Sequence, residues 1–236
     1  MYKRVLIKLS GESLLGKREY GIEPKACLHV AEELKSVHDA GISVVVVIGA
    51  GNIFRGLSAS QNGIERATAD YIGMMATVMN GLALQNALEK LGLETRLLSS
   101  LNVSQVAEAY IRRRALRHLE KNRVVILSGG TGNPYFTTDT GAALRTMELE
   151  CDALFKATKV DGVYDMDPVK HSDATRFDSL SHQQVIEQNL GVMDMAAMAL
   201  ARDNNITIEV YNFFQPGNTL RVASGQHIGT RVQTTD

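Results

Sequence analysis

Hydrophobic and polar residues follow two rhythms along this chain. Six short runs are mostly apolar and rich in Val, Ile and Leu, and they cover residues 4–9, 43–48, 95–100, 123–128, 153–158 and 206–211. In the run SVVVVI at 43–48, every residue after the serine is apolar, which is typical of a parallel strand buried on both faces. We therefore expect six strands in a sheet that is covered on both sides.

Between these runs, apolar residues recur at helical spacing. The segments concerned are 24–40, 64–91, 103–121, 139–151, 181–190 and 194–203. Strand alternating with helix predicts an α/β fold, a three-layer αβα sandwich with a mostly parallel central sheet. Because no repeat or Pro/Gly-rich linker divides the chain, residues 1–236 are expected to form a single domain. The stretch 12–24 has turn chemistry and is expected to form a hairpin.

Small residues mark one face of the expected helix at 64–91. Gly73, Thr77 and Gly81 follow one another at a spacing of four residues, so they lie in one row. Missing side chains let another backbone or a ligand come close. Both uses are open, and packing against a helix or a second subunit is favoured.

Composition narrows the class of protein. The chain has 236 residues, 44% hydrophobic and 22% charged, with a formal net charge of −1. These values are typical of a globular protein and argue against nucleic-acid binding or a polybasic membrane anchor. Cys27 and Cys151 lack CxxC spacing and histidine partners, so neither a zinc site nor a disulfide is expected. No apolar stretch is long enough for a membrane span, and a reducing cytoplasm is the expected location.

Three polar loops follow three of the expected strands. They are KLSGES at 8–13, GAGNIFRG at 49–56 and SGGTGNPYFTTD at 128–139. Ligands of open α/β sheets bind beyond the carboxyl ends of strands, and free N–H groups of glycine loops suit anions. Three such loops at one edge of the sheet predict a site for several phosphate groups.

Two familiar nucleotide-binding patterns are only imitated. GESLLGKR at 11–18 has Arg18 where the P-loop needs a hydroxyl, and GAGNIF at 49–54 has Phe54 where a dinucleotide-binding loop needs its third glycine. Neither a P-loop nor a Rossmann dinucleotide site is therefore expected.

Few charged residues lie at the three loops. Lys8 lies at the end of a buried strand, where an unpaired ammonium is costly, so a phosphate-binding role is favoured over an edge lysine. Arg55 carries a planar fork that suits bidentate phosphate contact. Asp139 stands where the third loop turns into a helix, and its two possible roles, N-cap and catalytic carboxylate, are compatible.

A fourth polar segment, KATKVDGVYDMDP at 156–168, allows two interpretations. Turn chemistry accounts for Asp161 and Gly162 in full. Tyr164, with aspartates on both sides and Lys156, Thr158 and Lys159 nearby, would also suit an adenine and ribose pocket. The residues alone do not decide between them. The basic run RRRALRH at 112–118 is expected to be a solvated helix face.

Taken together, these motifs resemble the amino-acid kinase superfamily and, within it, the bacterial uridylate (UMP) kinase family. The resemblance covers nearly the whole chain. Its marks are YKRVLIKLSGE at 2–12, IGAGNIFRG at 48–56, MMATVMNGLAL at 74–84, SGGTGNPYFTTDTGAALR at 128–145, KATKVDGVYDMDP at 156–168 and MDMAAMALARDN at 193–204.

The resemblance implies two binding sites and a reacting centre. The residues it assigns to ATP are Lys8, Ser10, Gly11, Gly51, Arg55, Thr158, Tyr164 and Asp167. Those it assigns to UMP are Gly49, Ala50, Asp70, Thr131, Gly132, Asn133, Pro134, Tyr135, Phe136, Thr137 and Thr138. The catalytic residues implied are Lys8, Arg55 and Asp139. Ala50 departs from the family pattern, which often has glycine there.

The implied activity is transfer of the γ-phosphoryl of ATP to UMP, with Mg²⁺ accompanying ATP and no metal ligands of the protein's own. We expect Asp139 to orient Lys8 or a Mg²⁺-bound water rather than to abstract a proton. The resemblance also implies a homohexamer that GTP activates and UTP inhibits. Two alternatives stay open, a kinase of the superfamily for a small acid, and a non-catalytic nucleotide- or anion-binding protein.

Overall fold

The structure is a computed structural model that describes residues 1–55, 63–171 and 173–234. Within these residues one nine-stranded sheet has the order β4-β3-β5-β2-β1-β6-β10-β11-β9, and β7 and β8 form a separate hairpin. The strands are β1 (Arg4–Leu9), β2 (Ser43–Ile48), β3 (Thr95–Ser99), β4 (Glu108–Ala109), β5 (Val124–Ser128), β6 (Ala153–Thr158), β7 (Val163–Tyr164), β8 (Arg176–Phe177), β9 (Ser179–Ser181), β10 (Ile208–Asn212) and β11 (Thr230–Gln233). In the nine-stranded sheet, β10 and β11 pair antiparallel and the other neighbours pair parallel.

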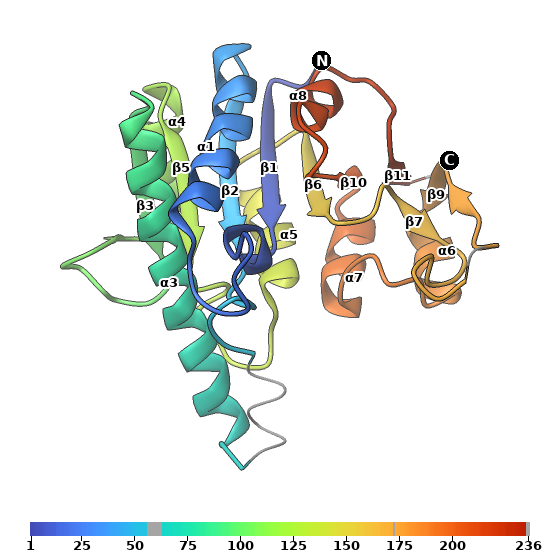
Figure 1. The fold of residues 1–236 in the computed structure, drawn as a ribbon, viewed down its shortest axis with the longest axis horizontal. Helices are drawn as coiled ribbons and strands as arrows, with labels where there is room; N and C mark the ends of the chain where they lie inside the picture. The colour runs from blue at the N-terminus through green and yellow to red at the C-terminus, as the bar shows by residue number, and fades with distance from the viewer. Residues whose placement is uncertain (56–62, 172, 235–236) are drawn as a thin grey trace.

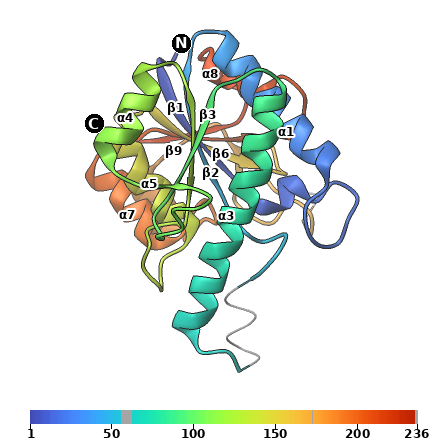
Figure 2. The same ribbon diagram turned by 90° about the vertical axis from the view of Figure 1, so that its left-hand side faces the viewer.

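Helices cover both faces of the sheet (Figures 1 and 2). One layer holds α1 (Pro24–Asp39), α3 (Arg66–Lys90) and α8 (Asn218–Ala223), and the other holds α4 (Arg112–Glu120), α5 (Thr138–Glu148), α6 (His182–Glu187) and α7 (Met195–Asp203). Side chains of each strand alternate between the two cores, as Ile7 on the α1 side and Leu6 on the α5 side show. The predicted three-layer sandwich with a mostly parallel sheet is confirmed.

Two local predictions are wrong. The segment 103–121 is helical only from Arg112, because the residues before it carry β4 and the Tyr110 N–H donates to the Ser99 carbonyl at 2.9 Å. The described segment 12–24 contains no hairpin. It begins in the 3₁₀ helix η1 (Gly11–Leu14) and returns through turns until the Glu23 N–H donates to the Leu14 carbonyl at 2.8 Å.

The carboxyl ends of the central strands lie at one edge of the sheet. In Figure 1 the arrowheads of β1, β2 and β6 point toward the end of the molecule from which the N-terminal part of α3 projects. The three loops predicted to bind phosphate follow β1, β2 and β5. Gly56, the last residue of the predicted loop 49–56, lies outside the described residues. None of the helices in the described ranges is both long enough and apolar enough to cross a membrane.

The loops after β1 and β2 are in direct backbone contact at Gly11. A Cβ on Gly11 would lie 2.3 Å from Asn52 Oδ1, 2.7 Å from the Gly49 carbonyl oxygen and 2.9 Å from the Gly51 nitrogen. Asn80 of α3 holds this arrangement, since its Nδ2 donates to the Gly49 carbonyl at 2.7 Å and to Asn52 Oδ1 at 2.7 Å. Only a residue without a side chain fits at position 11.

Replacing Gly11 should therefore weaken the fold. A methyl group at this site overpacks two backbones, so Gly11→Ala should lower the free energy of unfolding by about 1–3 kcal/mol. Gly191→Ala is the matched control, because no atom lies within 4 Å of its added Cβ. Denaturant unfolding at equal protein concentration measures both variants, and equal midpoints would contradict the close-contact argument.

Candidate active site

Strand register forces two lysines together at the sheet edge. β1 and β6 are parallel neighbours, and Lys8 is directly opposite Lys156. Adjacent strands lie roughly 5 Å apart, and both side chains point to the α5 side, as Leu6 and Leu154 two residues earlier do. Two ammonium groups at this distance repel one another unless an anion lies between them.

Asp139 supplies that anion. Its Oδ1 lies 2.6 Å from Lys8 Nζ and its Oδ2 lies 2.6 Å from Lys156 Nζ. The three side chains are 14%, 11% and 15% exposed for Asp139, Lys8 and Lys156, so water screens the pairs only weakly. Asp139 lies in the first turn of α5, where its N–H donates to the hydroxyl of the capping residue Thr137 at 3.0 Å. The N-cap role belongs to Thr137, and the Asp139 carboxylate is left for the lysines.

The protonation states follow from this geometry. Burial raises the pKa of Asp139, but Lys8 and Lys156 outweigh burial, so the pKa lies below its ordinary value and Asp139 is ionised. Burial lowers the pKa of Lys156, the charge of Lys8 lowers it as well, and Asp139 opposes both, so that the pKa is about 8. From sequence, Lys156 is expected only as a neighbour of a possible adenine and ribose pocket, not as a partner of Asp139. The signal that could have found it is the one that marked Lys8, a lysine at the end of a buried strand.

Two cavities lie on either side of the end of β6. The η1 cavity, of about 350 Å³, lies among η1, β1, β6 and the turn after β10, and Lys8 and Ser10 line it. The β7 cavity, of about 590 Å³, lies between β7 and the segment 188–193, and Asp139, Tyr164 and Asp167 line it. Lys156 and Thr158 line both. Five of the residues predicted to bind ATP, Lys8, Ser10, Thr158, Tyr164 and Asp167, therefore lie around one strand end.

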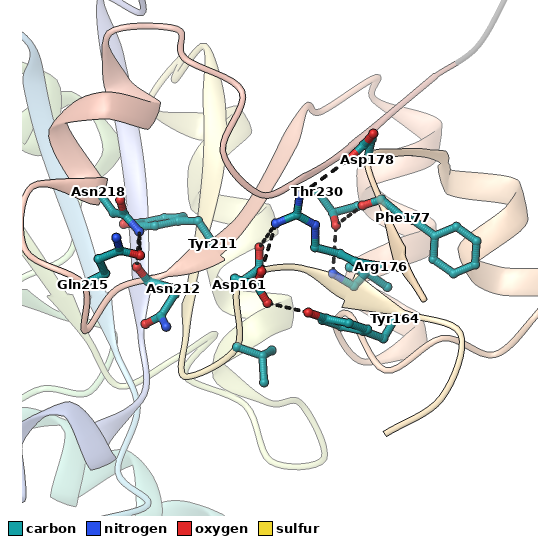
Figure 3. Close-up of polar contacts among 12 residues, drawn as sticks. Asp161, Tyr164, Arg176, Phe177, Asp178, Tyr211, Asn212, Gln215, Asn218 and Thr230 are labelled. Carbon is teal, nitrogen blue, oxygen red and sulfur yellow. Dashed lines mark hydrogen bonds and ion pairs between the residues drawn. The ribbon is translucent and has the colours of Figure 1, made fainter. Parts of the chain in front are cut away.

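The β7–β8 hairpin is held by a polar network at Asp161 (Figure 3). Its carboxylate accepts hydrogen bonds from the Tyr164 hydroxyl at 2.7 Å and from Arg176 Nη1 at 2.9 Å. The bond to Asp161 raises the pKa of Tyr164 above its ordinary value. Thr230 ties the hairpin to the sheet, because its hydroxyl accepts from the Val163 N–H at 2.8 Å. The segment 156–168 therefore fits both interpretations, because Asp161 and Tyr164 form the hydrogen bonds of a turn while Tyr164 and Asp167 line the β7 cavity.

A third cavity lies beside α3. This α3 cavity, of about 210 Å³, is lined by six of the residues predicted to bind UMP, namely Ala50, Asp70, Thr131, Phe136, Thr137 and Thr138. Gly73 and Thr77 line it as well. A Cβ on Gly81, by contrast, would lie 2.6 Å from Leu97 Cδ1 on β3. The small residues on α3 thus split: Gly81 packs against strand β3 rather than against a helix or a second subunit, and Gly73 and Thr77 open onto a cavity.

The loop after β5 is fastened to α3. Asp70 Oδ2 accepts from the Tyr135 N–H at 2.8 Å and from Arg66 Nε at 2.9 Å, and the Thr77 hydroxyl accepts from the Gly129 N–H at 2.7 Å. Tyr135 has a φ of 71°, which costs a non-glycine residue about 1 kcal/mol or more. The bond to Asp70 opposes that cost. Asp70 thus fixes the loop at the edge of the α3 cavity.

Four residues predicted to bind UMP form the turn of this loop, namely Gly132, Asn133, Pro134 and Tyr135. Gly132 has a φ of 82°, and a Cβ there would lie 3.2 Å from the Ser100 carbonyl oxygen. The Asn133 N–H donates to the Thr131 hydroxyl at 3.2 Å. In the described chain these four residues shape the loop and do not line the α3 cavity.

Arg55 lies apart from the Lys8–Asp139 pair. Its Nη2 forms an ion pair with Glu12 Oε1, and Glu12 Oε2 lies 2.7 Å from Lys159 Nζ. Within the described residues Arg55 lines none of the three cavities, whereas Glu12 and Lys159 line the η1 cavity. The structure therefore brings Lys8 and Asp139 into contact and holds Arg55 beside the η1 cavity through Glu12. Gly11, Gly49 and Gly51 contribute the backbone contact described above.

The donor set allows a test for a divalent metal. Asp139 Oδ1 lies 2.6 Å from Lys8 Nζ and has no hydrogen-bond partner beyond it among the described residues, and a carboxylate oxygen can accept from a second group. No group of three or more His, Cys, Asp or Glu residues gathers as a metal site in the described ranges. One carboxylate without a cage fits Mg²⁺ that is held mainly by phosphate oxygens and water.

Comparison with known proteins agrees with this arrangement. Residues 3–212 match the model of the amino acid kinase family. The chain is 55% identical to the uridylate kinase of Roseobacter denitrificans, over 98% of this chain and 96% of that one, and 54% identical to that of Xanthomonas oryzae pv. oryzae, over 98% and 97%.

Solved structures are similar over the full length. The UMP kinase of Bacillus anthracis superposes with a TM-score of 0.96 at 42% identity, covering 100% of this chain and 97% of that one. The UMP kinase of Ureaplasma parvum superposes with a TM-score of 0.93 at 35% identity, covering 99% and 100%. The chain therefore belongs to the amino acid kinase family, and within it to the uridylate kinases.

Proposed function

We propose that this chain transfers the γ-phosphoryl of ATP to UMP and yields UDP and ADP. Relatives named uridylate kinase share more than half of its residues over nearly the full length. One observation carries the proposal: Thr137 and Thr138 line the α3 cavity, and Asp139, the next residue, lies between two lysines at the β7 and η1 cavities. The acceptor site thus adjoins the donor site at a cationic centre.

The chemistry needs charge stabilisation rather than a base. The phosphate of a nucleoside monophosphate has a second pKa near 6, so most of it is a dianion at neutral pH and already nucleophilic. Phosphoryl transfer is catalysed mainly by positioning and by electrostatic stabilisation of the transferred group. Lys8 and Lys156 supply positive charge where the two sites meet. Asp139 stays ionised and keeps both ammonium groups in place.

Mg²⁺ belongs to the proposal as a companion of ATP. When bound, it would neutralise charge on the phosphate groups, and the carboxylate of Asp139 is the protein group that would fit it. Thr158, Tyr164 and Asp167 would bind the rest of ATP, and Asp70 with the 131–138 loop would bind UMP.

The alternatives explain less of the molecule. A kinase for a small acid has no use for a hydroxyl-rich loop beside a separate cavity, where hydroxyls and backbone groups can fix a uracil edge without adding charge. A non-catalytic binding protein has no use for two buried lysines on one carboxylate. A single domain, the homohexamer, activation by GTP, inhibition by UTP, the cytoplasmic location and the effect of Ala50 stay predictions.

The decisive assay is turnover with ATP and Mg²⁺. Purified protein is offered UMP, CMP, carbamate, acetylglutamate or aspartate, and ADP release is followed. UMP should be converted at the highest kcat/KM. Binding of UMP and ATP without turnover would support the non-catalytic alternative, and turnover with a small acid alone would support the other.

The role of Asp139 can be isolated by one substitution. Asp139→Asn keeps the shape but leaves two adjacent ammonium groups without a counter-ion, so kcat should fall at least about 100-fold, as for other preorganised groups. The dissociation constant for UMP should change by less than about threefold, because UMP is held by other groups. A loss confined to KM would contradict this role.

The pKa of Lys156 predicts an upper pH limit for the capture of ATP. Its pKa of about 8 means that the charged form, which attracts phosphate, dominates below pH 8 and is lost as the pH rises through that value. The kcat/KM for ATP should therefore fall above about pH 8, whereas kcat should hold to higher pH because bound phosphates favour the charged lysine. In Lys156→Arg, whose guanidinium stays protonated, the decline should disappear. An unchanged decline in this variant would assign the titration to another group.

A further inference from the structure

The site holds its cations in two trios with the same construction. The inner trio is Asp139 with Lys8 and Lys156. The outer trio is Glu12 with Arg55 and Lys159, in which each carboxylate oxygen of Glu12 faces one cation, Arg55 in close contact and Lys159 at 2.7 Å. The motifs assign Arg55 to the phosphates, place Lys159 only near a possible adenine and ribose pocket, and give Glu12 no role.

Glu12 connects three loops of the site. It lies in η1, where its N–H donates to the Ser10 hydroxyl at 3.2 Å, and it lines the η1 cavity together with Lys159. Its Cγ lies 3.9 Å from the position that a Cβ on Gly51 would occupy, so it packs over the loop after β2. One carboxylate thus ties the loops after β1, β2 and β6 at the rim of the cavity.

The two trios differ in exposure. The Arg55 and Lys159 side chains are each 64% exposed and Glu12 is 24% exposed, whereas every side chain of the inner trio is at most 15% exposed. The hydrogen bond from Lys159 lowers the pKa of Glu12 below its ordinary value against the effect of burial, and Arg55 adds to the lowering. Exposed ion pairs contribute little to stability, so both cations can leave Glu12 at small cost.

Phosphate is a stronger partner for both cations than a carboxylate is. It carries more charge, and its oxygens match the fork of Arg55. We infer that Glu12 is a positioning residue that occupies the place of a phosphate group, holds Arg55 and Lys159 at the η1 cavity, and gives them up to the phosphates of ATP. This inference rests on the proposed function, and it adds how the cations of the ATP site are held in place before ATP binds.

Removing the Glu12 charge should separate binding from turnover. In Glu12→Gln, ATP no longer competes with a carboxylate, so the dissociation constant of the non-hydrolysable analogue adenylyl imidodiphosphate with Mg²⁺ should fall about fivefold. Because Arg55 and Lys159 lose their fixed positions, kcat with UMP should fall about tenfold. Glu94→Gln is the matched control. Glu94 forms an ion pair with Arg123 at 2.7 Å and lines none of the three cavities of the described residues, so this substitution should change neither the dissociation constant nor kcat.

If Glu12→Gln only damages the protein, it should bind the analogue more weakly and unfold at lower denaturant concentration, and that outcome overturns the inference. A Glu12→Gln protein with the parent's dissociation constant and kcat overturns it as well. Lys159→Gln completes the test. In the Lys159→Gln background, Glu12→Gln should improve analogue binding less than it does in the parent. If the effects of the two substitutions on the binding free energy are fully additive, Glu12 does not act through Lys159 and the inference is overturned. A parent that binds the analogue but does not convert UMP would refute the proposed function, while the binding measurements would still decide the role of Glu12.

Discussion

A carboxylate between two like charges is the interaction on which the candidate active site depends. Parallel pairing of β1 and β6 places Lys8 beside Lys156, and the sheet cannot relieve their repulsion without losing register. Asp139, from a helix on the same face, relieves it by forming an ion pair with each lysine. Thr137 caps that helix, and its hydroxyl donates to Asp194 at the start of α7. The electrostatics of the centre therefore rest on a strand pair and two helix ends.

Much of the fold could be predicted because the central elements are long and regular. The apolar runs at 43–48 and 123–128 and the helical spacing of 24–40 each carry their own signal, and the structure has them within a residue or two. β4, β9 and β11 escaped prediction because two to four residues show no period. The hairpin expected at 12–24 failed for a different reason, since turn chemistry suits a 3₁₀ helix with turns as well as it suits a hairpin.

Candidate site residues could be predicted where they follow the end of a strand. They could not be predicted where strand register or tertiary packing decides which residues meet. Lys8 and Asp139 could be named from their loops. The partnership with Lys156 depends on which residues of two distant strands lie opposite, and no local pattern contains that. Gly73 and Gly81 look alike in sequence, yet one meets a cavity and the other meets Leu97.

Strand geometry also sets the kind of change that this enzyme can tolerate. Loops on the rim can vary in length while the proposed reacting centre keeps its shape, because its two lysines belong to the sheet. A single residue inserted within β6 ahead of Lys156 would turn its side chain to the α1 side, where the core is made of residues such as Ile7 and Phe155. An ammonium buried there would have no carboxylate beside it. We therefore expect insertions to be tolerated beyond the strand ends but not within β6, because the charge of Lys156 must stay on the α5 side of the sheet.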